Sequence, residues 1–521
     1  LVFWPLTMLL LVVAARLARR RPYVVLWLVG FFFWLAALQW LRLPHWATGF
    51  GWLALGLYFA FYLPIFIAVS RAAVHRLRVP VIVAAPVVWT GLELVRAHVL
   101  GGMTMASLGH TQYRWTALIQ VSDLGGAFAV SFLVMFAAAC LARALPCGSS
   151  RWTAWPLAAA VALPAAALAY GCARMSDGPA RGGDPIARIA LIQGSIDTQM
   201  QHDEGMAECM YRHYCDLSRQ ALAEAAAEGL RVDLMVWPES MFPESWVTSD
   251  PGATAPPECR DLSEHEFHRR LAEFVRESLR AMAETARAMG VPAIFGVDRR
   301  HYGVDRARIY NTAVCVSPQG ELLGSYDKMH LVMFGEYVPM TQYAPWLQGL
   351  TPLPVSVTAG DKPQGITLTP PGRTRRPVRI APNICFESVL SHVIRRQVRA
   401  LAQEGAEPDV LVNLTNDGWF WGSSELEMHL ACGVFRAVEC RKPFLIAANT
   451  GISAWIDGNG RLLAEGPRRR PCTLLAAVVA DSRRSYYLQY GDWPAGLCLA
   501  ATCLFALAGV RRGARGEGRG I

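Results

Sequence analysis

The sequence of 521 residues is 53% hydrophobic and only 17% charged, whereas soluble domains carry roughly 25% charged residues, so a wholly soluble protein is excluded. The net charge of +9 does not indicate a nucleic-acid partner, because many of the arginines lie in short loops beside apolar segments and not on one face of a basic domain.

The N-terminal third and the C-terminal end are strongly apolar. An apolar helix of about 20 residues can span a bilayer, so we predict an α-helical transmembrane domain over residues 1–173 with six visible spans, and a closing transmembrane helix over 494–511. The first span is short and the chain begins with Leu, so we expect the true N-terminus, with another helix, to be missing. The candidate spans are residues 2–18, 24–41, 47–69, 79–97, 118–145, 152–173 and 494–511.

The distribution of arginine predicts an orientation. Cytoplasmic loops of membrane proteins are enriched in Lys and Arg, and here the basic loops fall on alternate connections, after the first, third, fifth and last candidate spans. The segment 174–493 is then predicted to lie outside the cytoplasm. The basic loops are Arg16–Arg21, Arg71–Arg78, Arg143–Arg151 and Arg511–Arg519.

Two charged residues, Glu93 and Arg96, lie near the end of the candidate span at 79–97. A charge inside hydrocarbon costs at least a few kcal/mol, and residues three apart on a helix can pair. One interpretation is therefore an ion pair, or side chains that reach the membrane interface. The other is a role facing a lipid or substrate cavity.

None of the 13 cysteines belongs to a CxxC pair, and no Cys/His cluster has the spacing of a zinc site. We therefore predict no metal site, no cofactor and no disulfide framework. Cys140, Cys172, Cys498 and Cys503 lie in apolar segments, where we expect them to be small core residues.

Between the apolar regions, residues 174–185 form a turn-rich linker, after which short β-like runs alternate with helical stretches. This mixture indicates a layered α/β domain over 186–481, and the hairpin-like pair 309–316 and 321–326 argues against an all-parallel sheet. The predicted strands are 187–193, 232–237, 292–297, 309–316, 377–385, 409–414, 444–449 and 452–457, and the predicted helices are 204–229, 264–289, 387–403 and 424–441.

Three segments of this domain place a reactive group just past a β-like run. Glu239 ends the motif Trp-Pro-Glu, Lys328 stands in Asp-Lys-Met-His-Leu, and Cys385 begins Cys-Phe-Glu. Sites in α/β folds assemble at strand ends. We therefore expect these three side chains to meet.

Together the three groups are sufficient for acyl chemistry. Cysteine reacts as the thiolate, and its free pKa is about 8.5. A carboxylate whose pKa is raised by burial can take the thiol proton, while an ammonium favours the thiolate and can donate to a developing oxyanion. Such a set can make and break an acyl thioester.

The order of these motifs, followed by Asn416–Phe420 (Asn-Asp-Gly-Trp-Phe) and Arg436–Glu439 (Arg-Ala-Val-Glu), resembles the nitrilase (carbon–nitrogen hydrolase) superfamily over about residues 187–480. The resemblance implies an α/β nitrilase-like αββα sandwich. It assigns Glu239 as the base, Cys385 as the nucleophile and Lys328 as the third member of a catalytic triad.

Seven membrane spans around such a domain resemble the architecture of the apolipoprotein N-acyltransferases. That family moves an acyl chain from a phospholipid to the N-terminal amine of a diacylglyceryl-cysteine lipoprotein. The resemblance implies a multi-pass protein of the bacterial cytoplasmic (inner) membrane with its catalytic domain on the periplasmic, extracytoplasmic side. The implied partners are the phospholipid acyl donor, the diacylated lipoprotein acceptor and membrane lipids, and we expect a monomer.

The resemblance also implies supporting roles. Phe386 is the expected oxyanion donor, through its backbone N–H, together with Lys328. Glu336 and Glu387 match family residues that support the active site, either as hydrogen-bonded scaffold carboxylates or through a direct role. The implied substrate-binding residues are Trp237, Trp419, Phe420 and His202, of which Trp419 and Phe420 could equally be core aromatics.

We therefore predict an N-acyltransferase that forms an acyl thioester on Cys385. The chain departs from the family pattern in the loops at 102–105, 201–204 and 419–424, which bears on substrate preference and not on reaction type. Two alternatives stay open. A membrane-anchored nitrilase-type amidohydrolase would use water as acceptor and need no lipid, and a transporter or receptor would tolerate the loss of Cys385.

Overall fold

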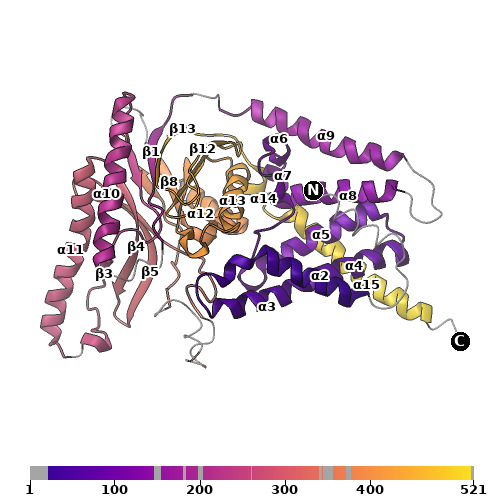
Figure 1. Cartoon of the computed structure of the whole chain (residues 1–521), viewed down its shortest axis with the longest axis horizontal. Coiled ribbons are helices and arrows are strands. Elements are labelled where there is room, and N and C mark those ends of the chain that lie inside the picture. Colours follow the sequence, from indigo (N-terminus) through magenta and orange to yellow (C-terminus); the bar gives the residue numbers. More distant parts are fainter. Residues whose placement is uncertain are drawn as a thin grey trace.

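The computed structural model describes residues 22–145, 154–179, 183–197, 204–259, 261–338, 343, 346, 356–370 and 377–517. A layer of helices and a two-sheet α/β body lie side by side along the longest axis of the molecule (Figure 1). The predicted span at 2–18 lies outside the described residues, and the predicted domain limits stay a prediction.

The helical layer is built from apolar helices. By length and composition, five helices in the described part of the chain could cross a membrane, namely those within Thr48–Arg76, Val81–Gly101, Ala127–Ala144, Trp155–Ser176 and Trp493–Arg512, and the apolar helix Tyr23–Ala37 is shorter. The helices are α2 (Pro22–Ala37), α3 (Thr48–Ala60), α4 (Tyr62–Arg71), α5 (Val81–His98), α8 (Ala127–Ala144), α9 (Trp155–Ser176) and α15 (Trp493–Glu517).

One predicted span, 118–145, differs from the structure. Its first part forms the short helices α6 (Thr116–Ile119) and α7 (Ser122–Gly125), and α8 begins only after Gly126. Gly126 has a φ of +68°, and a Cβ at this position would lie 2.7 Å from the ring of Tyr487. A glycine is therefore required at this turn, because it alone adopts positive φ without cost and leaves room for the ring.

The α/β body contains two mixed sheets. One has the strand order β13-β1-β2-β4-β5-β6, with β3 also paired to β4, and the other has the order β12-β11-β10-β9-β8-β7. The predicted hairpin is confirmed, since β5 and β6 pair in antiparallel fashion. The strands are β1 (Ala187–Gln193), β2 (Leu234–Val236), β3 (Trp246–Ser249), β4 (Ala293–Tyr302), β5 (Ala307–Val316), β6 (Leu322–Asp327), β7 (Ile366–Leu368), β8 (Val378–Ile384), β9 (Val410–Thr415), β10 (Phe444–Ala448), β11 (Ala454–Ile456), β12 (Leu462–Glu465) and β13 (Cys472–Val478).

Helices cover the outer faces of both sheets, which confirms the αββα sandwich. In β1, Ile189 and Leu191 face the core between the sheets, whereas Ala190 and Ile192 face the helices outside, as the alternation of side chains along a strand requires. The first sheet is covered by α10 (Glu204–Ala227) and α11 (Glu264–Met289), and the second by α12 (Ser391–Gln403) and α13 (Glu425–Cys440).

A buried ion pair and a buried hydrogen bond join the sandwich to the helical layer at the C-terminal end of α13. Arg441 Nη2 lies 2.6 Å from Asp123 Oδ2 on α7, and both side chains are completely buried. Glu439 Oε1 accepts a hydrogen bond from the backbone N–H of Ala127 at 2.9 Å. The C-terminal end of α13, the helix that covers the second sheet, is thus held against α7 and α8.

The ion pair predicted for Glu93 and Arg96 is confirmed, with 3.7 Å between Glu93 Oε1 and Arg96 Nη2. Arg96 also donates to Met105 O at 3.0 Å, and Leu108 N donates to Glu93 Oε1 at 2.9 Å. The pair therefore fixes the loop that connects α5 to the next helices.

Of the four cysteines expected in the core, two are placed differently. Cys140 is buried and Cys498 is half-buried, but Cys172 and Cys503 are exposed. The expectation is therefore wrong for Cys172 and Cys503. The reason is that α9 and α15 pack against the protein along one side only, so that much of their apolar surface points outward.

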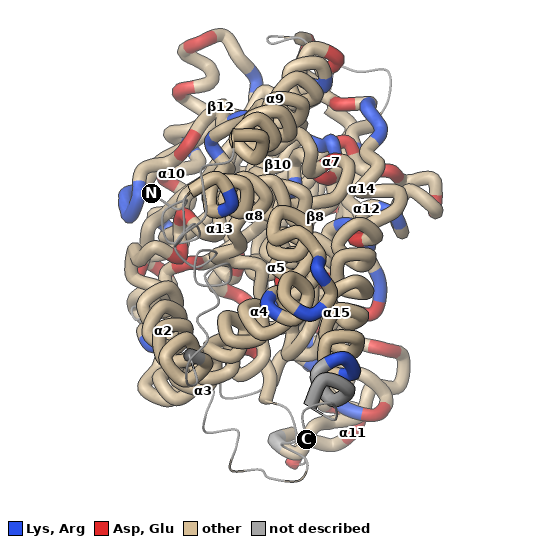
Figure 2. Tube along the Cα trace, turned by 90° about the vertical axis from the view of Figure 1, so that its right-hand side faces the viewer, with Lys and Arg blue, Asp and Glu red and all other residues tan. Residues whose placement is uncertain are grey.

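The basic ends of two helices lie together. Arg76, after α4, donates to Gly509 O of α15 at 2.8 Å, and Arg512 donates to Arg76 O at 2.8 Å. Figure 2 views the helical layer from this side and shows blue segments beside α4 and α15. The sandwich lies at the opposite end of the molecule (Figure 1).

Candidate active site

Glu239 lies three residues beyond the buried strand β2, and it is only 8% exposed. Asn311 Nδ2 donates to its Oε1 at 2.7 Å, and the backbone N–H of Asn416 donates to its Oε2 at 3.0 Å. Gly296 on β4 makes room for this turn, because a Cβ there would lie 2.2 Å from Pro238 O. The carboxylate is therefore held in one orientation by both sheets.

Lys328 directly follows β6, and its side chain is 1% exposed. Its ammonium Nζ donates to Glu336 Oε1 at 2.8 Å and lies 3.4 Å from Glu239 Oε1. The backbone N–H of Lys328 donates to Asn311 O at 2.8 Å. Asn311 thus connects the base and the lysine through both its side chain and its backbone.

Cys385 directly follows β8 and opens a short 3₁₀ turn over Cys385–Val389. Its φ is +50°, a left-handed conformation that is uncommon for residues other than glycine and costs about 1–3 kcal/mol. The surrounding structure must hold it there. Strained backbone of this kind is concentrated at functional sites.

The electrostatics of the three groups are coupled. Burial raises the pKa of the Cys385 thiol well above its ordinary value, Glu239 raises it further, and Lys328 opposes both. Burial also raises the pKa of Glu239, against the lowering effect of Lys328. Burial lowers the pKa of Lys328, but the carboxylates of Glu336 and Glu239 raise it to well above its ordinary value. Burial therefore favours the neutral thiol of Cys385, and the two carboxylates favour the charged form of Lys328.

The two further glutamates have different roles. Glu387 is completely buried, and its Oε1 accepts from Tyr326 OH at 2.8 Å and from the backbone N–H groups of Met329 and His330 at 2.8 and 3.0 Å. Its Oε2 accepts from Ile384 N at 2.8 Å. Glu387 therefore acts as a scaffold that joins the loop after Lys328 to the nucleophile turn, whereas Glu336 pairs directly with the Lys328 ammonium.

Aromatic side chains near the nucleophile belong to an apolar cluster shared with the helical layer, which we name the junction cluster. Phe386 and Phe420 are half-buried and pack against it, and the ring of Phe420 lies 4.9 Å from that of Trp40 in an edge-to-face contact. Trp419 is half-buried. The buried members of the junction cluster are Trp34, Leu38, Trp40, Phe59, Met103, Met105, Val389, Leu390 and Cys432.

One residue expected to bind substrate, Trp237, belongs to the core of the sandwich. Trp237 is completely buried in the core under α10, where its Nε1 donates to Ser218 Oγ at 3.0 Å and its ring lies 5.1 Å from that of Phe295. The indole is thus a core side chain in this structure, and the role of Trp237 in substrate binding stays a prediction. His202 lies outside the described residues.

The structure adds residues to the site that the sequence reasoning missed. Asn311 and Asn416 bind Glu239, and the buried His429 of α13 contacts the nucleophile turn. The Asn-Asp-Gly-Trp-Phe motif, which contains Asn416, was a signal for one of them. No local sequence motif marks Asn311 or His429 as a site residue, because Asn311 lies within strand β5 and His429 lies within helix α13.

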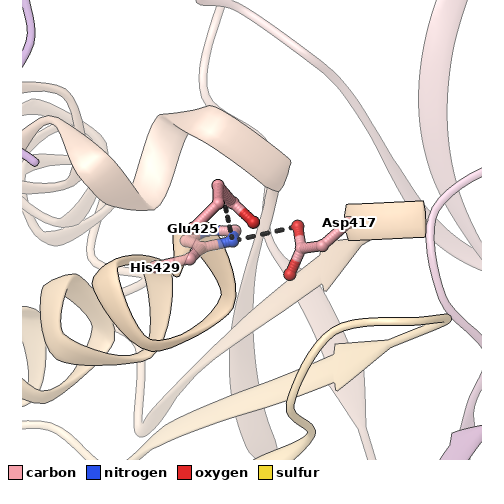
Figure 3. A group of neighbouring side chains, drawn as sticks. All are labelled: Asp417, Glu425 and His429. Carbon is pink, nitrogen blue, oxygen red and sulfur yellow. Dashed lines mark hydrogen bonds and ion pairs between the residues drawn. The ribbon is translucent and has the colours of Figure 1, made fainter. Parts of the chain in front are cut away.

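One group in the described residues combines side chains of the kind that bind metals. Asp417, Glu425 and His429 place one ligand atom each within 4.8 Å of one another (Figure 3). However, both ring nitrogens of His429 already have hydrogen-bond partners, Asp417 Oδ1 at 3.1 Å and Ser388 Oγ at 2.7 Å. The arrangement is therefore that of a hydrogen-bonded network behind the nucleophile.

The sequence is similar to known families along most of its length. Residues 188–487 match the carbon-nitrogen hydrolase family, and residues 1–140 match the apolipoprotein N-acyltransferase N-terminal domain. The two matched regions correspond to the sandwich and to most of the helical layer.

Three similar proteins, each matched over most of its length, are apolipoprotein N-acyltransferases. The apolipoprotein N-acyltransferase of Rhodopirellula baltica is 31% identical over 93% of this chain and 88% of the relative. That of Geobacter metallireducens is 34% identical over 87% of this chain and 79% of the relative. That of Azotobacter vinelandii is 30% identical over 81% of this chain and 72% of the relative.

Proposed function

Because the chain belongs to the apolipoprotein N-acyltransferase family, we propose that it acylates the N-terminal amine of diacylated lipoproteins with a triad of Glu239, Lys328 and Cys385. The observation that carries this assignment is the geometry around Lys328, whose ammonium lies 3.4 Å from Glu239 and 2.8 Å from Glu336 in a buried site beside the Cys385 thiol. This arrangement supports a base and a cation that act together on the Cys385 thiol, whose pKa both groups influence.

The first half-reaction moves an acyl chain from a phospholipid to the enzyme. The Glu239 carboxylate takes the proton of the Cys385 thiol, and the thiolate forms a C–S bond with the ester carbonyl carbon. Lys328 and the backbone N–H of Phe386 donate to the oxyanion of the tetrahedral intermediate. The ester C–O bond then breaks, Glu239 returns the proton to the leaving oxygen, and a lysophospholipid departs.

The second half-reaction moves the acyl chain to the acceptor. Glu239 takes a proton from the α-amine of the diacylglyceryl-cysteine as the amine forms a C–N bond with the thioester carbon. The C–S bond breaks, an amide is released, and the proton on Glu239 returns to the Cys385 sulfur. Because two substrates share one covalent intermediate, we expect ping-pong kinetics.

The junction cluster supports a lipid substrate. It extends from the nucleophile turn, through Phe386 and Phe420, to Trp34, Trp40 and Phe59 of the helical layer. A phospholipid cannot leave the bilayer easily, because each buried CH₂ contributes about 0.8 kcal/mol to its retention. The half-buried rings of Phe386 and Phe420, which pack against this cluster beside the nucleophile turn, support an acyl chain that reaches the thiol from the apolar layer, with Trp419 and Phe420 as the proposed substrate contacts.

We also propose an orientation in the bacterial inner membrane. The adjacent basic ends of α4 and α15 carry Arg76 and Arg512 and lie at the end of the helical layer remote from the sandwich. The enrichment of cytoplasmic loops in Arg supports a cytoplasmic position for this end and a periplasmic position for the sandwich. We propose a monomer with no nucleic-acid partner.

The proposal is tested by trapping the intermediate. The purified protein is incubated with a phospholipid labelled in its acyl chain, and the label is located by peptide mass spectrometry. We expect label on Cys385 that is absent in C385A and retained in C209A, which removes an exposed cysteine of α10. Addition of a diacylated lipopeptide should discharge the label as an amide. Label on another residue would disprove the triad, and rapid loss of label to water without an acceptor would favour the amidohydrolase.

A further inference from the structure

The carbonyl group of Cys385 is held by three side-chain donors. Asn413 Nδ2 lies 3.2 Å from this oxygen, Ser388 Oγ lies 3.1 Å from it, and His429 Nε2 lies 3.2 Å from it. A carbonyl oxygen ordinarily accepts one or two hydrogen bonds. The concentration of donors on this one atom indicates that the orientation of the Cys385–Phe386 peptide is under close control.

Hydrogen-bond accounting assigns the protons of His429. Its Nδ1 lies 3.1 Å from Asp417 Oδ1, with Glu425 Oε1 farther away at 3.9 Å (Figure 3), and we assign a proton to Nδ1 because the Asp417 carboxylate can only accept. The single proton of the Ser388 hydroxyl is donated to Cys385 O. The Cys385 carbonyl oxygen, 3.2 Å from Nε2, can only accept, so Nε2 also carries a proton, with Ser388 Oγ 2.7 Å away.

The charge assigned in this way agrees with the surroundings of the ring. His429 is 3% exposed. Burial lowers the pKa of the imidazole, but Asp417 and the acceptors on the ring raise it to above its ordinary value. His429 is therefore a buried cation whose Nε2–H points at the nucleophile turn from behind.

The peptide after Cys385 transmits this contact to the reacting atoms. In a planar trans peptide, the C=O of one residue and the N–H of the next point in opposite directions. A donor that fixes the Cys385 oxygen therefore also fixes the direction of the Phe386 N–H. Hydrogen bonds in series polarise one another, so a cationic donor on the oxygen also makes the N–H a stronger donor.

We propose that His429 is a positioning residue of the oxyanion hole, which acts through the Cys385–Phe386 peptide to aim and strengthen the Phe386 N–H. This inference rests on the proposed function, since it concerns the oxyanion formed when the thiolate attacks an ester. Asp417 holds the ring from the other side, and Thr415 Oγ1 in turn donates to Asp417 Oδ1 at 2.7 Å.

Two reactions of the same thiol separate this role from a structural one. Formation of the acyl thioester passes through an oxyanion, whereas alkylation of the Cys385 thiol by iodoacetamide does not. Both rates are measured on the full-length protein in detergent. Alkylation is followed at Cys385 by peptide mass spectrometry, because Cys172, Cys209 and Cys503 are also exposed.

We expect H429A to lower the single-turnover acylation rate by about 10- to 100-fold, which is less than the loss of a complete oxyanion donor, and to leave the alkylation rate within about twofold. H429Q, whose side-chain amide can still donate, should recover part of the loss. S388A removes a donor to the same oxygen and one hydrogen-bond partner of His429, but keeps the imidazole itself, and should give a smaller decrease in acylation alone. H392A, which removes a half-buried imidazole stacked on His98, is the matched control and should change neither rate.

The inference is overturned if both rates fall together in H429A and S388A, because His429 would then serve only to place the thiol. It is equally overturned if neither rate falls. Failure of the proposed function gives a different result, since the unmodified protein would then form no acyl thioester on Cys385 at all.

Discussion

The Lys328 ammonium lies 2.8 Å from Glu336 Oε1, a shorter contact than the 3.4 Å that separates it from Glu239 Oε1. Asn311 donates to both carboxylates, at 2.7 Å to Glu239 and 3.3 Å to Glu336. Because the cation is shared unequally, Glu239 keeps more of its basicity than it would in an exclusive ion pair. Glu336 is in this sense a counter-ion that leaves the base free to act.

We predict that E336Q lowers the acylation rate of Cys385 by about 10- to 100-fold, within the range contributed by a positioned general base. Loss of the Glu336 carboxylate leaves Glu239 as the sole anionic partner of the Lys328 ammonium. This exclusive pairing lowers the pKa of Glu239 and makes Glu239 a weaker base. The measurement is the single-turnover rate of thioester formation. E321Q, at an exposed glutamate of the β5–β6 turn, should leave that rate unchanged, and an unaltered rate in E336Q would contradict the role assigned to Glu336.

The thiol pKa provides a second prediction, with opposite signs for two substitutions. Glu239 raises the pKa of Cys385 and Lys328 lowers it. In E239Q, the midpoint of the pH profile of iodoacetamide alkylation should therefore move to lower pH, because a nearby negative charge is lost. In K328M it should move to higher pH, because a nearby positive charge is lost.

Acyl transfer should be lost in both variants. The alkylation profile still reports the pKa of the Cys385 thiol, so it measures the electrostatic effect of each substitution when catalysis is absent. Site-resolved alkylation at Cys385 between pH 6 and pH 11 provides the test. A shift of both midpoints in the same direction would show that the three groups are not electrostatically coupled as the geometry indicates.

The sequence was sufficient to predict those features that depend on local order. Helix α11 was predicted over 264–289 and found at Glu264–Met289, because Ser263 caps its first turn and Gly290 ends it in the left-handed conformation. Glu239, Lys328 and Cys385 were identified because each follows a buried strand and their chemistry is complementary. The role of His429 was not predictable, since it depends on α13 packing against a turn 44 residues earlier.

The burial of Trp237, which its motif alone does not indicate, leads to a third prediction. W237A should lower the free energy of unfolding by about 3–5 kcal/mol, as expected for a large aromatic side chain lost from a core, because the indole is completely buried among Tyr214, Phe242 and Phe295. W237F should cost less and leave the KM for phospholipid unchanged. Thermal unfolding and steady-state kinetics check both, and a raised KM in a stably folded W237F would restore a substrate contact.

Glu387 is predicted to be needed for structure more than for chemistry. E387Q replaces one acceptor oxygen with a donor, so at least one of four buried donors, which include Tyr326 OH and Ile384 N, loses its partner. The expected cost is about 1–3 kcal/mol for each unsatisfied group. A lower melting temperature together with slower acylation and slower alkylation is expected, because the nucleophile turn itself is displaced.

The contrast with H429A is informative, since that substitution should affect acylation alone. E407Q, at a carboxylate that pairs with Lys442 but is itself 57% exposed, is the control for E387Q and should change the melting temperature little. Normal alkylation of Cys385 in a destabilised E387Q would argue against the scaffold role.

The junction between the sandwich and the helical layer yields the last prediction. Asp123 Oδ2 accepts from Arg441 Nη2 at 2.6 Å and from Arg174 Nε at 2.9 Å, and its Oδ1 accepts from Tyr170 OH at 2.6 Å. Removing one partner of a buried ion pair costs about 3–5 kcal/mol, because the other charge stays buried without compensation. D123N should therefore lower the melting temperature strongly, whereas D216N, which breaks the exposed pair with Arg219, should cost at most about 1 kcal/mol.

The double variant D123N/R441M distinguishes an ion pair from simple packing. Because the charge of Arg441 is removed together with its partner, part of the stability lost in D123N should return. The recovery should be incomplete, because Arg174 still lacks its partner Asp123. Since α13 carries both Arg436 and His429, we expect D123N also to slow acylation of Cys385 under conditions where the protein remains folded. Full activity in a strongly destabilised D123N would show that the junction holds the two layers together without influencing the nucleophile turn.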